Sequence, residues 1–451
     1  MGMWVAESQQ FSDNNSQSRR LMSFQYGVLS LKNLDSEILI ESLISSIKKQ
    51  KLEATLVKEI ITTANTSAAT SHCGEKYSKR SEDQQYTRAG TSEKTIICSV
   101  GALTFKTTKV RDNYQNKIIK PVYQLIQFSG KQRYQPEIVM ISVDFVQKMS
   151  YRDAVEELSL VLPDVPSPTT INNQVKAIGK EIPISHPDAC LPVAMADGTK
   201  SHSQEPGVKQ NDINVVLGFD EKQPVLLGIT VNQSWRQLSE SLNTERAISE
   251  TAVIVSDGEV ELKAAFTNES VKFQTDVIHG FRILGYKLWE DKALDLNQRK
   301  QVINELKSLL LSLKNVVVNH TSDTDRIGNK INSVVDGIEA LAKRLTARGC
   351  HQSAKFLNEY SNTLVTFARM ALNGIEIPWN SNTIERLMGE ISKRIKHKWM
   401  RWTTEGLETI LRLILVRYTE PQRYREFRDA KMGLTNFLNI TFQLSVESTA
   451  A

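Results

Sequence analysis

The stretch from residue 191 to residue 278 constrains the fold most, because short apolar runs alternate there with turn signals and two short helical patterns. Helices are expected at Ser234–Leu242 and Glu261–Phe266. Five runs are expected to be strands: Leu191–Ala196, Ile213–Phe219, Val225–Val231, Thr251–Val255 and Phe273–Ile278. Three strands in succession favour antiparallel pairing, whereas strands separated by helices favour parallel crossovers. We therefore predict an α/β fold with a mixed five-stranded sheet flanked by helices.

All-α parts are expected to be added to this sheet. Residues 291–375 are dense in Leu, Ile and Val and show no strand pattern, which predicts a purely helical segment. Two more helices are expected at Ser381–Lys396 and Glu405–Tyr418.

The chain before this region is predicted to contain three parts. Residues 1–62 form a polar tail and a helical segment, and residues 63–94, rich in Ser, Thr and charge, form a flexible linker. Residues 95–185 contain a β-hairpin around Gly101 and a pair of helices, Ser150–Leu160 and Thr169–Ile182. Residues 186–420 form the main domain, and 421–451 a C-terminal tail.

The helical pair of residues 150–182 has the outline of a helix-turn-helix DNA reader. Asn172, Asn173 and Lys176 lie on the outer side of its second helix, where they are expected to reach base edges or phosphates. An ordinary helical hairpin is the alternative.

Three carboxylates stand out by their positions. Asp197 and Asp257 follow the first and fourth strands, and Glu385 lies on a late helix. The first and fourth strands of such a sheet are neighbours, so Asp197 and Asp257 are expected to meet, with Glu385 as a third ligand. Carboxylates suit a pair of Mg²⁺ ions, which Mn²⁺ can replace, for phosphodiester cleavage. Gly198 and Gly258 leave room for a phosphate backbone, although Asp-Gly is also a common turn dipeptide.

The positive charge of the chain is concentrated beside Glu385. The net charge of the whole chain is +5, and the segment 386–401 alone carries six basic residues and one acid, Glu390. We expect these six to bind DNA phosphates: Arg386, Lys393, Arg394, Lys396, Lys398 and Arg401. A solvated basic face is the alternative.

Several classes of protein are excluded or disfavoured by the sequence. Four cysteines without a C-x-x-C pair argue against a disulfide scaffold. The start of the chain does not resemble a signal peptide, and no apolar run approaches the ~18 residues of a membrane span. The sequence contains no P-loop motif, so no nucleotide cofactor is predicted. A cytoplasmic protein, associated with the nucleoid, is expected.

The motifs resemble those of the Mutator-like group of prokaryotic insertion-sequence transposases. The first and second blocks are Asp197-Gly198-Thr199 and Asp257-Gly258-Glu259. Asp276-Val277-Ile278-His279 matches the block in which relatives carry Cys or Asp three residues before His. Asn382-x-x-Glu385-Arg386 matches the third-acid block, and this spacing favours Glu385 over its rival Glu390.

This resemblance implies a ribonuclease-H-like catalytic domain with a DDE triad, Asp197, Asp257 and Glu385. It implies that residues 291–375 are a helical insertion before the last catalytic helix. His279 and Asn382 are expected to support the ligands. Trp235, Trp289, Trp399 and Trp402 are candidates for stacking on unpaired bases, although a core or interface role is commoner.

The expected function is therefore metal-dependent DNA transposition. The chain would bind terminal inverted repeats, cleave transposon-end DNA and join it to target DNA, as a homodimer or a larger synaptic complex. Two alternatives remain open at this point: a catalytically silent, domesticated DNA-binding relative, and a stand-alone DNA nuclease of the same fold.

Overall fold

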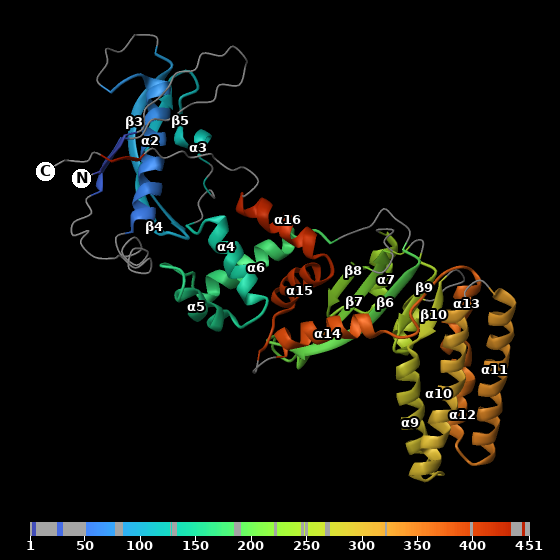
Figure 1. Ribbon diagram of the computed structural model, residues 1–451. Coiled ribbons are helices and arrows are strands. Elements are labelled where there is room, and N and C mark those ends of the chain that lie inside the picture. Colours follow the sequence, from blue (N-terminus) through green and yellow to red (C-terminus); the bar gives the residue numbers. More distant parts are fainter. Residues whose placement is uncertain are drawn as a thin grey trace. The chain divides into compact units, whose positions relative to one another are not determined.

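The structure is a computed structural model in which the chain divides into two compact units (Figure 1). It describes residues 2–5, 25–29, 51–76, 84–126, 128, 133–184, 191–220, 223–244, 248, 251–266, 271–320, 323–396, 400–433 and 444–446. One unit comprises Met1–Ile171 and Arg428–Ala451, and the other comprises Asn172–Phe427.

The first unit contains two small antiparallel sheets. One has the order β11-β1-β2, from Leu444–Val446, Gly2–Val5 and Gln25–Leu29. The other joins β3 (Tyr86–Cys98), β4 (Gly101–Asp112) and β5 (Lys117–Ile119), and the hairpin predicted around Gly101 is confirmed. Three helices follow in the chain: α3 (Val122–Leu125), α4 (Pro136–Val146) and α5 (Tyr151–Ser159).

The linker predicted over residues 63–94 is instead mostly regular structure. The helix α2 runs from Leu52 to Cys73, and β3 begins at Tyr86. Small side chains of α2, such as Ala64 and Ala68, are buried, so the Ser/Thr/Ala composition marks a closely packed helix. Asn65 fixes α2 to β4, since its Nδ2 donates to Thr108 Oγ1 (3.1 Å) and its Oδ1 accepts from the Thr108 amide (2.8 Å).

The second unit is built on a five-stranded mixed sheet. The strands are β6 (Val193–His202), β7 (Gln210–Asp220), β8 (Gln223–Val231), β9 (Val253–Ser256) and β10 (Lys272–Thr275), in the order β10-β9-β6-β7-β8. β6, β7 and β8 are antiparallel, whereas β9 and β10 run parallel to β6. The predicted mixed α/β sheet and the adjacency of its first and fourth strands are confirmed.

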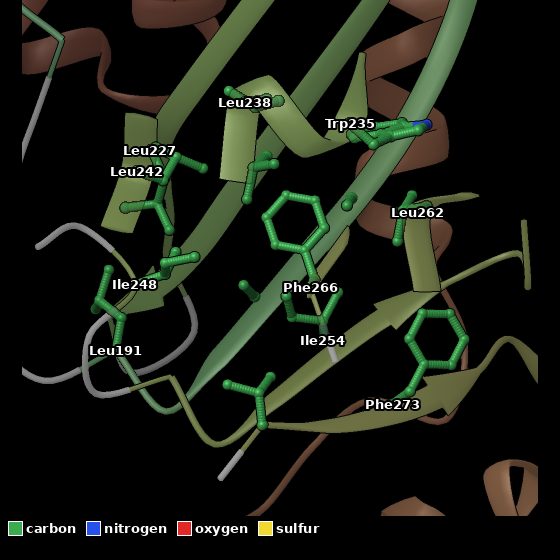
Figure 2. Packing of buried hydrophobic residues seen from close by; sticks show 14 residues of the cluster. Leu191, Leu227, Trp235, Leu238, Leu242, Ile248, Ile254, Leu262, Phe266 and Phe273 are labelled. Carbon is green, nitrogen blue, oxygen red and sulfur yellow. The ribbon is translucent and has the colours of Figure 1, made fainter. Parts of the chain in front are cut away.

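One face of this sheet is covered by two short helices, α7 (Trp235–Thr244) and α8 (Val260–Phe266). Ala194 and Ala196 of β6 belong to the hydrophobic cluster on this side. Figure 2 shows side chains of both helices in the same cluster, among them Trp235, Leu238, Leu262 and Phe266. Side chains alternate along a strand. Asp197 therefore lies on the opposite face of β6.

The rest of the second unit is helical. After β10 the helices are α9 (Val277–Asp291), α10 (Leu296–Asn319), α11 (Thr324–Ala347), α12 (His351–Leu364), α13 (Thr366–Leu372), α14 (Asn382–Ile395) and α15 (Thr404–Thr419). α13 is tied to the sheet, because Phe367 N donates to Gln274 Oε1 and Thr366 Oγ1 to Phe273 O.

Two helices cross the borders between the units: α6 (Pro168–Glu181) and α16 (Pro421–Met432). α16 replaces the first part of the tail expected over 421–451. Within the described residues, no helix is long and apolar enough to cross a membrane.

Candidate active site

Three aspartates lie at one level of three adjacent parallel strands. The β6–β9 register pairs Met195 with Val255, and the β9–β10 register pairs Ser256 with Thr275. Continued beyond these pairs, the two registers bring Asp197, Asp257 and Asp276 to the same row. Asp257 and Asp276 directly follow the short strands β9 and β10, whereas β6 continues five residues beyond Asp197, to His202. The prediction that Asp197 ends its strand is wrong, because β7 pairs with β6 up to His202.

Asp197 is half-buried, and its surroundings disfavour the negative charge of its carboxylate. Its Oδ1 accepts from the Gly198 amide at 2.8 Å, and within the described residues no cation pairs with it. Burial raises the pKa of Asp197 to about 7; the Gly198 hydrogen bond and the His279 ring oppose this shift, and the negative charges of Asp257 and Glu385 add to it. A cation at this position would therefore stabilise the carboxylate.

Asp257 is held at the start of a glycine turn. Its Oδ1 accepts from Ser256 Oγ (3.2 Å) and from the Glu259 amide (3.1 Å). Gly258 has a φ of +97°, a value that favours glycine, and a Cβ there would lie 3.3 Å from Tyr360 Cε1. Gly258 is therefore needed both for its backbone conformation and for space.

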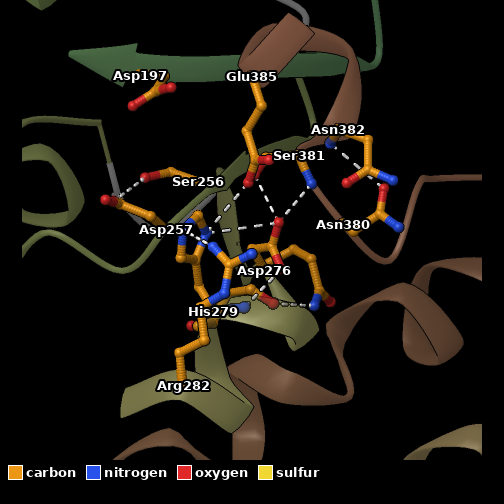
Figure 3. Close-up of polar contacts among 12 residues, drawn as sticks. Asp197, Ser256, Asp257, Asp276, His279, Arg282, Asn380, Ser381, Asn382 and Glu385 are labelled. Atoms are coloured by element: carbon orange, nitrogen blue, oxygen red, sulfur yellow. Dashed lines mark hydrogen bonds and ion pairs between the residues drawn. The ribbon is translucent and has the colours of Figure 1, made fainter. Parts of the chain in front are cut away.

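Glu385 reaches the same place from the first turn of α14. Its Oε1 lies 3.5 Å from both Ser381 Oγ and His279 Nδ1. Figure 3 shows Asp197, Asp257 and Glu385 around one end of the sheet, with His279 between them and Asp276. The charges of Asp257 and Glu385 both act on Asp197, so the three carboxylates predicted from the sequence lie in one region, although Asp197 and Asp257 are not in the group of close donor atoms formed by Asp276, His279 and Glu385.

Asp276 is completely buried and joins the starts of two helices. Its Oδ1 accepts from the His279 amide (2.9 Å) and caps α9, while its Oδ2 accepts from the amide (2.7 Å) and Oγ (2.5 Å) of Ser381, which precedes α14. Burial favours the neutral acid, but the hydrogen bonds from His279 and Ser381 outweigh it and hold the pKa of Asp276 well below its usual range. We name this arrangement of Asp276 and Ser381 the Asp276 clamp.

The sequence predicted a strand up to Ile278 and so placed His279 at its end. His279 instead lies in the first turn of α9, because β10 ends at Thr275 and Asp276 caps the helix. Contact with Asp276 raises the pKa of His279; burial opposes this, and the charges of Glu385 and Asp257 add to it. Its Nε2 lies 3.2 Å from Arg282 Nη1, so in the neutral ring Nε2 accepts and Nδ1 carries the hydrogen.

The donor atoms of this place suit a divalent cation. Asp276, His279 and Glu385 each offer a ligand atom within 4.8 Å of the others. His279 Nδ1 is buried without a hydrogen-bond partner and lies 3.7 Å from Asp276 Oδ2 and 3.5 Å from Glu385 Oε1, so as an N–H it faces these carboxylates and offers no lone pair to a cation. Both oxygens of Asp276 are engaged by the clamp, whereas Asp197 and Glu385 have few partners. Hard oxygen ligands of this kind are those that Mg²⁺ prefers.

The remaining residues predicted near the ligands are placed less centrally. Gly198 faces Asn214 and Trp235, since a Cβ there would approach both within 3.4 Å. Asn382 is exposed, and its amide lies 3.4 Å from Asn380 Oδ1. Glu390, the rival of Glu385, forms an ion pair with Lys393 (2.5 Å) and does not join the cluster.

The predicted DNA-binding residues occupy different environments. Arg386 and Arg401 are exposed, Lys398 is outside the described residues, and Lys396 Nζ donates to Thr199 Oγ1 of β6 (2.9 Å). Arg394, by contrast, is only 3% exposed and lies over the Trp402 ring. It has the helical spacing of a core position, so it stabilises α14 and is not available to DNA.

The predicted reader helix α6 turns one side towards α15. Lys176 Nζ pairs with Glu405 at 2.7 Å, while Asn172 is half-buried and Asn173 exposed. Of the tryptophans, Trp235 and Trp402 are buried, Trp399 is outside the described residues, and Trp289 is exposed.

Asp276 was named from the sequence only as part of a block that matches relatives, without a role, and Ser381 and Arg282 were not singled out. Asp is a preferred N-cap residue, and its place directly before the helical run of α9 could have identified Asp276. Ser381 has the same signal, immediately before α14. The partnership between them joins residues 105 positions apart and has no local signal.

The comparison with known proteins gives the family of the chain. The family model for the Mutator family of transposases matches residues 30–422, which include the whole sheet and all the residues of the site. Among curated proteins no sequence matches the chain. The extent of the family match shows that the chain belongs to the Mutator family of transposases.

Proposed function

We propose that this chain cleaves and joins DNA with a DDE triad formed by Asp197, Asp257 and Glu385. The observation that carries the proposal is the convergence of these carboxylates, from β6, β9 and α14, at one end of a mixed sheet. The strand order, three antiparallel strands extended by two parallel ones, supports a ribonuclease-H-like fold with the helices of 291–375 as an insertion.

The three carboxylates would hold two Mg²⁺ ions, for which Mn²⁺ can substitute. Such ions make water a nucleophile near neutral pH and stabilise charge on the leaving oxygen. The half-buried Asp197, whose negative charge is disfavoured without a cation, would be a ligand of these ions.

The other residues of the site position the ligands and the DNA. Ser256 and the turn at Gly258 fix Asp257, and the Asp276 clamp sets the start of α14 and so the position of Glu385. His279, between Asp276 and Glu385, orients the glutamate. Lys396 and the exposed Arg386 and Arg401 lie on or after α14, where they are suited to bind backbone phosphates.

The DNA partners follow from the proposed reaction. The terminal repeats of the element would be cut to free a 3′-hydroxyl, which then attacks target DNA in the same site. Two ends must be paired for this, so we propose a dimer or a larger complex acting at the nucleoid in the cytoplasm.

The test is cleavage and strand transfer on the DNA that flanks this gene, with Mg²⁺ or Mn²⁺. Asp197→Asn, Asp257→Asn and Glu385→Gln should each reduce cleavage to below about one hundredth of the wild-type rate, since even residues that only orient ligands cost 10–100-fold. Binding of the same DNA, measured by fluorescence anisotropy, should persist.

Glu390→Gln is the matched control, because Glu390 lies on the same helix but is paired with Lys393. It should leave cleavage nearly unchanged. Normal cleavage by Asp197→Asn would refute the triad, and equal losses in Glu385→Gln and Glu390→Gln would refute the choice of Glu385.

A further inference from the structure

One face of α9 carries a line of residues that leads away from the site. His279, Arg282, Tyr286 and Trp289 are separated by three, four and three positions, so they share one side of the helix. The opposite side of α9 packs in the core through Val277, Gly280, Phe281, Leu284 and Leu288. The line therefore faces away from the interior. We name Arg282, Tyr286 and Trp289 the α9 strip.

Two large aromatic side chains are exposed together on this strip. Tyr286 is 57% and Trp289 55% exposed, and their rings stack with centroids 5.8 Å apart at an interplanar angle of 29°. Single exposed apolar residues are common on protein surfaces, but an exposed stacked pair offers a preformed flat surface to a ligand. Flat rings of this kind stack on nucleic-acid bases of any sequence.

The charge around the pair suits an anionic ligand. Arg282 is exposed and, within the described residues, forms no ion pair with an acid. The acids near the end of the helix are engaged: Glu290 pairs with Lys287 at 2.7 Å, and Asp291 accepts hydrogen bonds from the start of α12. Arg282, which is hydrogen-bonded to His279 and has no acidic partner among the described residues, thus provides a cation between the site and the aromatic pair.

The dimensions match a short piece of a DNA strand. Ten residues separate His279 from Trp289, which corresponds to about 15 Å along the helix. At 3.4 Å per step of a stacked strand this gives room for at most about four nucleotides, and for fewer in an extended unpaired strand. In a duplex the bases are stacked on each other, so only an unpaired base can insert against Tyr286 or Trp289.

We propose that the α9 strip binds an unpaired DNA strand beside the cleaved phosphate. Arg282 contacts a backbone phosphate, and Tyr286 and Trp289 stack on an unpaired base. The inference rests on the proposed function, because it assigns the site an opened DNA end. A second protein copy is a less suitable occupant, since charged side chains flank the pair on its own helix.

The experiment measures binding of the full chain in EDTA, where no cleavage occurs. The probes are a labelled blunt duplex and the same duplex with a single-stranded tail of about six thymidines. Wild-type protein should prefer the tailed probe. Trp289→Ala should reduce this preference about five-fold or more, whereas Trp289→Phe should retain most of it. Arg282→Gln should lower the salt dependence of binding to the tailed probe by about one counterion.

Tyr418→Ala, which removes an exposed aromatic ring from α15, is the matched control and should leave the preference unchanged. An equal preference in wild type and Trp289→Ala overturns the inference. So does light scattering that shows Trp289→Ala dissociating an oligomer while the tail preference stays the same.

Cleavage of the element's ends, measured in parallel, separates this inference from the proposed function. A wild-type protein that cleaves in an Asp197-dependent way but ignores the tail overturns the α9 strip alone. A wild-type protein that prefers the tail but shows no Asp197-dependent cleavage overturns the proposed function, on which the strip's place in the reaction depends.

Discussion

At the scale of the residue, the single carboxylate of Asp276 accepts hydrogen bonds at the N-termini of two helices, α9 and α14. One oxygen begins α9 and the other holds Ser381 at the start of α14, at 0% exposure. A buried carboxylate is tolerated because the two amides and the hydroxyl satisfy it. The geometry of Glu385 depends on this side chain, although Asp276 is itself too engaged to be an efficient ligand.

Asp276→Asn should therefore lower the free energy of unfolding by about 2–3 kcal/mol. The NH₂ group of the asparagine would face the N–H and O–H donors of His279 or Ser381, and the charged acceptor would be lost. Urea unfolding of the full chain measures this. Asp295→Asn is the control, because Asp295 is the capping residue of α10 and asparagine caps equally well; it should change stability by less than about 0.5 kcal/mol. Equal effects in the two variants would contradict the clamp.

At the scale of the element, α6 packs tightly on α15. A Cβ on Gly179 would lie 2.5 Å from the carbonyl oxygen of Thr409, so only glycine allows this approach. Lys176 and Lys180 of α6 both pair with Glu405, at 2.7 and 2.5 Å. The side of α6 that contacts α15 therefore serves packing, and only the side carrying the exposed Asn173 remains for DNA.

Gly179→Ala should destabilise the protein by about 1–3 kcal/mol, because backbone must move to admit the methyl group. In α14 a Cβ on Gly389 meets nothing within 4 Å, so Gly389→Ala should stabilise by about 0.5–1 kcal/mol. Thermal or urea unfolding of both variants gives the comparison. A neutral Gly179→Ala would show that α6 and α15 are not in close contact.

The ion pairs of Lys176 and Lys180 with Glu405 also predict that the stability of the protein depends on pH. Hydrogen bonds and charge from Lys176 and Lys180 lower the pKa of Glu405 from 4.5 to about 2. The unfolded chain therefore binds more protons in this interval, and the stabilising contribution of Glu405, complete above pH 4.5, is lost as pH falls towards 2. The stability difference between wild type and Glu405→Gln, followed by unfolding against pH, should shrink over that range; a constant difference would contradict the ion pairs.

At the scale of the whole molecule, the basic segment 386–401 is a mixture of functions. Arg394 is part of the core and Lys393 is paired with Glu390, whereas Lys396 reaches β6 next to the row of aspartates. The excess of positive charge in the sequence therefore overstates the number of side chains available to phosphates.

Lys396→Gln should reduce the slope of log affinity against log salt by about 0.9, the value for one phosphate contact. Lys355→Gln, which removes an exposed lysine from α12, should leave the slope unchanged. Anisotropy titrations over a range of salt give both slopes, and identical slopes for wild type and Lys396→Gln would remove Lys396 from the DNA interface.

The sequence predicted the sheet well, because apolar runs and turn signals are local. It also predicted that Asp197 and Asp257 meet, since strand order follows from the pattern of crossovers. The β6 extension beyond Asp197 escaped prediction because Gly198 and Lys200 resemble a turn, and only pairing with β7 makes them a strand. The burial of Arg394 was predictable from its helical spacing to Leu387 and Ile391. The many basic residues around it led instead to the prediction of a DNA contact.

The Asp276 clamp also bears on how this protein can change over evolutionary time. α9 and α14 begin at one buried carboxylate although Asp276 and Ser381 are 105 positions apart, so the intervening helices leave the sheet and return to it at the same point. α12 and α13 also contact the sheet, since Tyr360 Oη donates to Gly258 O and Phe367 N donates to Gln274 Oε1. Changes to the intervening helices that spare these contacts alter neither end of the excursion, so a lineage can lengthen those helices or graft binding modules onto them while the glutamate keeps its place.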